Sequence, residues 1–95
     1  MAKKIIQIVN QVITLLDQGE VAEAIRLLDL KIKDNSTDDH LYYIRGNAYY
    51  KLGDWQNAMQ NYMEAAELNP DSPAQEALKM TQSILEFYNT DIYCQ

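Results

Sequence analysis

Residues 39–72 constrain the fold more than any other part of the chain, because small and aromatic residues recur in them at offsets typical of a helical hairpin. The segment reads DHLYYIRGNAYYKLGDWQNAMQNYMEAAELNPDS. Gly53 separates two helix-forming stretches, and Asn69-Pro70 ends the second. A hairpin of this size cannot bury its apolar side alone, so it must stack on further helices. The segment therefore predicts a binding or assembly surface and not a catalyst.

Eight positions of this segment resemble the tetratricopeptide repeat, a helix–turn–helix unit of about 34 residues. The matching residues are Tyr42, Gly46, Tyr49, Gly53, Ala58, Tyr62, Ala65 and Pro70. Arg45 departs from the family pattern, in which leucine is usual before the first glycine. The resemblance implies an all-α fold, built as a right-handed stack of helix–turn–helix repeats, and a function in protein–protein interaction.

A diverged copy of the same unit precedes it by one period. Gly19 aligns with Gly53 and Ala24 aligns with Ala58, whereas Val12 replaces the first glycine of the pattern. We therefore predict a single domain over residues 1–95 with four parts. These are a degenerate repeat at 5–38, a well-matched repeat at 39–72, a capping helix at 73–88 and a tail at 89–95.

Turn and capping residues predict where five helices begin and end. The first is expected over about residues 4–18, the second over 21–33, the third up to Gly53, the fourth up to Leu68 and the fifth over 73–88. Ser36 with Asp39 is predicted to cap the third helix, and Asp54 the fourth. Ser72 is predicted to cap the fifth, with Gln75 completing a capping box.

The resemblance implies that the first helix of each repeat lines a concave surface that contacts the ligand. The residues at these positions are His40, Tyr43, Asn47 and Tyr50 in the second repeat, and Ile6, Val9, Ile13 and Leu16 in the first. Spacings of three and four residues do place each set on one helix face. We expect this groove to bind an apolar or aromatic peptide, or an amphipathic helix. Tyr43 and Tyr50 could equally pack against neighbouring helices.

The first predicted helix supports an alternative function. Its apolar residues cover about half of the circumference, which is wider than the stripe of roughly 100° on an ordinary amphipathic helix. Ile6 and Ile13 are expected to stay partly exposed at the edge of this arc. The chain could therefore be a dimeric assembly protein that associates through this helix.

The tail allows one further arrangement. Ile92 and Tyr93 could turn back and cover the groove as a built-in competitor. A frayed terminus is the commoner state of such a segment.

Charge is distributed unevenly along the chain. Residues 1–51 carry seven basic and seven acidic side chains, whereas residues 52–95 carry seven acidic ones and only Lys79, which gives the net charge of −6. An acidic surface repels phosphate backbones and favours neutral or basic protein partners, so nucleic-acid binding is not expected.

Other classes of function have little support in the sequence. His40 is the only histidine and Cys94 the only cysteine, so we expect no metal site and no cofactor. A lone cysteine favours a reducing compartment, and no stretch is long and apolar enough to span a membrane. We therefore expect a cytoplasmic protein, and an enzyme is the least expected class.

Overall fold

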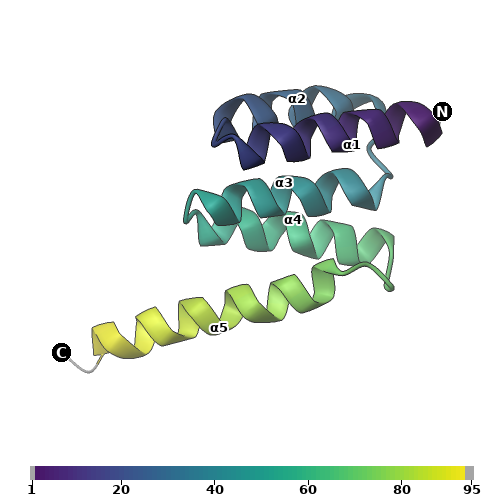
Figure 1. The fold of residues 1–95 in the computed structure, drawn as a ribbon. Coiled ribbons are helices and arrows are strands. Elements are labelled where there is room, and N and C mark those ends of the chain that lie inside the picture. The colour runs from purple at the N-terminus through teal and green to yellow at the C-terminus, as the bar shows by residue number, and fades with distance from the viewer. Residues whose placement is uncertain (1, 94–95) are drawn as a thin grey trace.

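The computed structural model describes the backbone of residues 2–93 and the side chains of residues 6–87. Its helices are α1 (Ala2–Asp17), α2 (Val21–Asp34), α3 (Asp39–Lys51), α4 (Trp55–Leu68) and α5 (Ala74–Tyr93). The described backbone contains no strand. Figure 1 shows two antiparallel hairpins, α1–α2 and α3–α4, stacked on one another, with α5 beside the second hairpin. The predicted all-α stack of helix–turn–helix units is thus confirmed.

The turns inside the two hairpins have the same geometry. Gly19 and Gly53 follow the first helix of each hairpin and have φ angles of 80° and 74°. Glycine adopts this left-handed conformation without the steric penalty of a Cβ atom. In both turns the next backbone N–H donates to a carbonyl five residues earlier, Glu20 to Leu15 and Asp54 to Tyr49. The equivalent bonds satisfy carbonyls that the helix ends would otherwise leave unpaired.

The predicted caps of α4 and α5 are present, whereas α3 is capped by a different residue from the one predicted. Asp54 accepts a hydrogen bond from the backbone of Asn57, and Ser72 Oγ accepts one from Ala74 N at 3.1 Å. The prediction that Ser36 caps α3 is wrong, because Asp38 Oδ1 accepts the bond from the backbone N–H of His40 at 3.0 Å. Asp38 directly precedes the helix, which places its carboxylate beside the first free N–H groups.

The fifth helix differs from its prediction at both ends. Gln75 Nε2 donates to the carbonyl of Pro70 at 2.7 Å, so its side chain reaches the preceding turn and does not complete a capping box. The helix continues to Tyr93, five residues past the expected end at Tyr88, since no glycine or proline interrupts it. In Figure 1 its last turns lead away from the stack. The tail backbone up to residue 93 therefore does not fold over the groove; the side chains of Ile92 and Tyr93 lie outside the described residues.

The core consists of two clusters with α3 between them. The first joins α1, α2 and α3 and contains Val12, Leu16, Ala24, Leu28, Ile32, Leu41, Ile44 and Ala48. The second joins α4 to α5 and contains Ala58, Tyr62, Ala65 and Ala74. Tyr42 and Tyr43 of α3 pack against both clusters. Because α3 packs against α1, α2 and α4, few of its side chains are exposed, and their positions are fixed by the surrounding helices.

Candidate functional site

A cavity of about 220 Å³ opens between α3, α4 and α5. We call it the tyrosine pocket; its lining residues are Tyr43, Asn47, Tyr50, Tyr62, Ala77 and Met80. Three of the predicted binding residues, those at 43, 47 and 50, are among them. They come together because their spacing along α3 places them on one helix face, which borders the first turns of α5.

Aromatic contacts hold the walls of the tyrosine pocket in place. The rings of Tyr43 and Tyr62 are tilted by 42° with centroids 6.0 Å apart. The ring of Tyr50 meets that of Trp55 edge-on, with centroids 5.1 Å apart. Both geometries are favourable for aromatic pairs. Tyr43 and Tyr50 are each half-buried, so each packs against a neighbour and also presents part of its ring to the cavity.

Tyr62 forms the base of the tyrosine pocket and orients Asn47, the main polar side chain in its lining. The Tyr62 side chain is buried, and its hydroxyl donates a hydrogen bond of 2.6 Å to Asn47 Oδ1. Burial raises the pKa of the Tyr62 phenol, and the nearby Tyr43 and Tyr50 raise it further, so the phenol stays protonated as the donor. Because the carbonyl oxygen of Asn47 is occupied, its Nδ2 hydrogens are the atoms that can donate to a ligand.

The α5 side of the tyrosine pocket is apolar and adaptable. Ala77 leaves space beside the rings, and Met80 is 60% exposed at the mouth. A methionine side chain is flexible and polarizable, which lets it adjust to ligands of different shape. The tyrosine pocket thus has a rigid aromatic wall on α3 and a movable apolar wall on α5.

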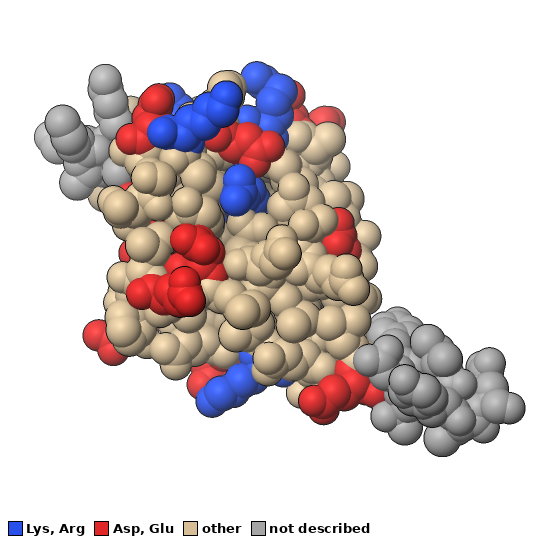
Figure 2. Space-filling model, turned by 180° about the vertical axis from the view of Figure 1, so that it is seen from behind, with Lys and Arg blue, Asp and Glu red and all other residues tan. Residues whose placement is uncertain are grey.

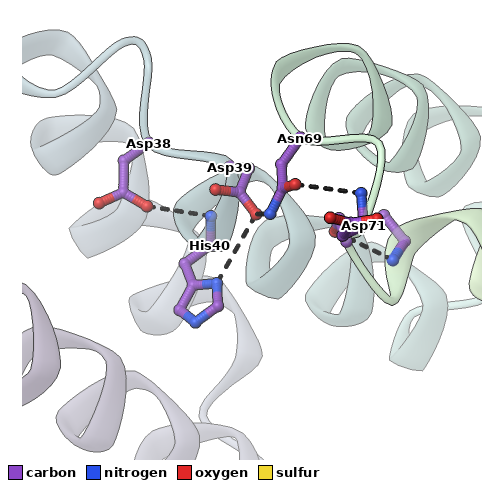
Figure 3. A network of polar contacts seen from close by, with 7 residues as sticks. Asp38, Asp39, His40, Asn69 and Asp71 are labelled. Atoms are coloured by element: carbon purple, nitrogen blue, oxygen red, sulfur yellow. Dashed lines mark hydrogen bonds and ion pairs between the residues drawn. The ribbon is translucent and has the colours of Figure 1, made fainter.

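The fourth predicted residue of α3 lies outside the tyrosine pocket. His40 is on the first turn of the helix, and its side chain is exposed. Its Nδ1 is 3.8 Å from Asp39 Oδ2, which also accepts a bond of 3.2 Å from Asn69 Nδ2. Figure 3 shows this network joining the start of α3 to the turn after α4. His40 can contact a ligand only at the edge of the groove.

The predicted residues of α1 fall into three environments. Ile6 and Ile13 are exposed, by 59% and 40%, and Val9 between them is half-buried. Leu16 is only 7% exposed and belongs to the first core cluster, so it supports the surface from beneath. None of the four lines the tyrosine pocket. Ile6, Val9 and Ile13 form a separate apolar surface on α1.

Sequence reasoning missed two components of the tyrosine pocket and a second groove. Tyr62 and Met80 line this pocket, although neither is among the binding residues predicted from the sequence. The second groove encloses about 420 Å³ and is lined by Tyr42, Arg45, Gln60, Asn61, Met63, Glu64 and Glu67. Its one signal in the sequence was Arg45, at a position where the resemblance implies leucine.

Two further observations concern the described residues alone. They contain no group of three or more histidine, cysteine, aspartate and glutamate side chains that could hold a metal ion. Among their helices, none combines the length and the hydropathy that crossing a membrane requires.

Comparisons with known proteins relate both the sequence and the fold to other chains. The family model described as tetratricopeptide repeat matches residues 41–72, which include the α3 and α4 walls of the tyrosine pocket. The solution NMR structure of Bacteroides fragilis protein BF1650 is similar to this chain with a TM-score of 0.81. The two sequences are 46% identical over 90% of this chain and 87% of that one. The search of curated proteins found no match.

Proposed function

Because the chain belongs to the tetratricopeptide repeat family, whose repeats generally mediate protein–protein interaction, we propose that it binds a protein segment in the groove formed by α1, α3 and α5. The observation that carries this proposal is the tyrosine pocket. It lies on the groove side of α3 and brings together Tyr43, Asn47 and Tyr50. The ligand is an apolar or aromatic peptide, or the apolar face of an amphipathic helix.

The size and lining of the tyrosine pocket indicate how the segment is anchored. Pockets for drug-sized molecules are about 300–1,000 Å³, and this one is about 220 Å³. It therefore suits one large side chain of a partner better than a whole small molecule. Tyrosine rings and a methionine offer contact area for such an apolar anchor, and buried anchors of this kind dominate binding energy at interfaces.

Asn47 adds a directional contact next to the anchor. Its oxygen is held by the Tyr62 hydroxyl. Its two amide hydrogens have no hydrogen-bond partner among the described side chains and backbone, and they can donate to a backbone carbonyl of the bound segment. A donor fixed beside an apolar pocket sets the orientation of a peptide, which a purely apolar surface does not.

The electrostatics favour particular partners. The chain has a net charge of −6, so we propose neutral or basic protein segments and not nucleic acids. The single cysteine fits a reducing compartment, and we propose the cytoplasm as the site of action. The proposed role is a binding role without catalysis.

The test starts from a peptide library, because the partner is defined by chemistry alone. Random dodecapeptides displayed on phage are selected against the immobilised chain, and the affinity of the selected peptides is measured by calorimetry. Tyr43→Ala combined with Tyr50→Ala should weaken binding at least tenfold while circular dichroism still shows a folded helical protein. Selected peptides that bind this variant as tightly as the wild type would place their site elsewhere.

A second candidate function is self-association through α1. Ile6 and Ile13 are seven residues apart on one face of α1, which belongs to the hairpin at the end of the stack, and both are exposed. An exposed apolar face of this kind is a common contact between copies of a chain.

Sedimentation equilibrium over a wide concentration range tests this second candidate. A wild-type dimer that becomes a folded monomer on combining Ile6→Glu with Ile13→Glu would support it. A wild-type chain that stays monomeric at all concentrations would exclude it and leave the whole groove free for a ligand.

A further inference from the structure

The second groove lies between α3 and α4, and we call it the acidic groove. Its lining residues, given above, come from α4, where all but Asn61 are exposed, and from the α3 side chains Tyr42 and Arg45. They share no residue with the tyrosine pocket. Figure 2 shows the molecule from behind, where α2 and α4 lie; the middle of this face is largely uncharged, with a few acidic and basic side chains set into it.

Arg45 is held firmly at one side of the acidic groove. Its Nη1 contacts Asp29 Oδ1 at 2.9 Å, and its Nε donates to Asn61 Oδ1 at 2.6 Å. Its guanidinium carbon lies 5.5 Å from the centroid of the Tyr42 ring, within the range of a cation–π contact. The charge of Arg45 is thus compensated by Asp29, and three contacts fix its position.

Two carboxylates that line the acidic groove have no counter-charge. Glu64 and Glu67 are exposed, and neither forms an ion pair with any side chain in the described part of the chain. Since Arg45 and Asp29 cancel, the groove keeps about two negative charges. These charges lie next to apolar surface, because Met63 is 50% exposed and the ring of Tyr42 is half-buried.

We propose that the acidic groove is a second docking surface, which takes a basic amphipathic segment of a partner protein. An apolar side chain of that segment packs against Met63 and Tyr42, and a lysine or arginine beside it pairs with Glu64 and Glu67. Charge complementarity selects this occupant, because a neutral or acidic segment would leave the two carboxylates without a counter-charge. The proposal is independent of the tyrosine pocket, with which the acidic groove shares no lining residue.

The location of the acidic groove has a structural consequence. The tyrosine pocket is reached through α3 and α5, and the acidic groove through the outer face of α4. Two segments can therefore bind the chain at the same time. A small chain with two docking surfaces joins two partners, or grips two segments of one partner with a gain in avidity.

A lysine–leucine peptide tests the proposal. The probe is a synthetic helical dodecapeptide of lysine and leucine, with leucines on one face, and its glutamate–leucine counterpart is the control. The protein is labelled with ¹³C on its methionine methyl groups, since Met63 reports on the acidic groove and Met80 on the tyrosine pocket. We expect the lysine peptide to shift the Met63 resonance, with an affinity that falls as salt is raised, and the glutamate peptide to leave it unchanged.

Charge-matched variants separate the acidic groove from the general acidity of the chain. Combining Glu64→Gln with Glu67→Gln should lower the affinity for the lysine peptide about tenfold, which is the effect expected from the loss of two exposed ion pairs. Combining Glu20→Gln with Glu86→Gln makes the same change in net charge at exposed positions outside the groove, and it should have little effect.

Two results would overturn the proposal. An equal loss of affinity in both double variants would mean that the peptide follows the overall charge. A shift of Met80 without a shift of Met63 would place the peptide in the tyrosine pocket, which would support the proposed function and contradict the second surface.

Discussion

Gly46 of α3 and Tyr62 of α4 are in direct contact, and the glycine leaves no space for a side chain. A Cβ atom added to Gly46 would lie 2.6 Å from both Cδ1 and Cε1 of the Tyr62 ring. The ring cannot move aside easily, because it is buried and its hydroxyl is bonded to Asn47. The glycine therefore lets the Tyr62 ring pack directly against α3, where this ring also lines the tyrosine pocket.

The first prediction concerns Gly46→Ala. Alanine improves helix propensity by up to about 1 kcal/mol, whereas overpacking against a fixed ring costs about 1–3 kcal/mol. We expect the steric effect to prevail, so that the free energy of unfolding falls by about 1–2 kcal/mol in urea titrations.

A double-mutant cycle shows whether Tyr62 is the cause of that loss. In a Tyr62→Leu background the ring is absent, and Gly46→Ala should become neutral or slightly stabilising. If Gly46→Ala costs the same in both backgrounds, the clash with Tyr62 is not what selects glycine here.

The second prediction concerns the hydrogen bond between Tyr62 and Asn47. Tyr62→Phe keeps the ring and removes the hydroxyl that donates to Asn47 Oδ1. The expected loss is about 0.5–1.5 kcal/mol in the free energy of unfolding at neutral pH. Peptide affinity should also fall, because Asn47 is no longer held in one orientation. Unchanged stability and unchanged affinity together would contradict this role.

The third prediction concerns alkaline pH. The pKa of the Tyr62 phenol is raised above its ordinary 10.0 in the folded chain. The unfolded chain therefore releases this proton first, and the stabilisation from the neutral buried phenol, complete below pH 10, declines as the pH rises further. Wild type should thus lose more stability than Tyr62→Phe between pH 9 and about 11. Parallel urea titrations measure the difference in the free energy of unfolding between wild type and Tyr62→Phe, which should become smaller as the pH rises. A difference that stays constant would be inconsistent with a buried phenol.

The fourth prediction concerns the position where the family usually has leucine. Arg45→Leu would leave the oxygen of Asn61 buried without its donor, since Asn61 is only 7% exposed. An unsatisfied buried acceptor costs about 1–3 kcal/mol. Combining Arg45→Leu with Asn61→Leu should recover much of that loss, as both polar partners are then removed. A double variant that is less stable than the sum of the single ones would refute this pairing.

The fifth prediction compares one substitution on the two surfaces. Met80→Glu and Met63→Glu introduce the same charge at similarly exposed positions, 60% and 50%. Met80→Glu should weaken the binding of an apolar peptide severalfold, whereas Met63→Glu should leave it unchanged. Thermal melts of both variants check that the fold is retained. Equal effects of the two substitutions on peptide affinity would argue against the tyrosine pocket as the specific site of the apolar peptide.

The helical framework could be predicted from the sequence because its signals are local. Gly53 marks a turn by its conformational freedom, and Asp54 and Ser72 cap helices through nearby backbone groups. Helical periodicity alone predicts that Tyr43 and Tyr50 lie on the same face of α3. These features depend on residues a few positions apart, which a sequence displays directly.

The parts that were missed depend on contacts between distant residues. Tyr62 acts both as core and as the base of the tyrosine pocket, which requires knowing how closely α3 approaches α4 at Gly46. The acidic groove depends on Arg45 reaching Asp29 and Asn61, each 16 residues away. The cap of α3 was assigned to the wrong residue because Ser36 and Asp38 are both suitable by type, and only the path of the turn selects between them.

Methionine-methyl NMR of the full chain with a neutral, aromatic-containing peptide from the display selection tests the central claim most directly. If the segment binds in the tyrosine pocket, the Met80 methyl resonance moves in proportion to saturation while that of Met63 stays in place. A complex in which Met80 is unaffected, although calorimetry shows binding, would contradict the assignment of the tyrosine pocket as the peptide site.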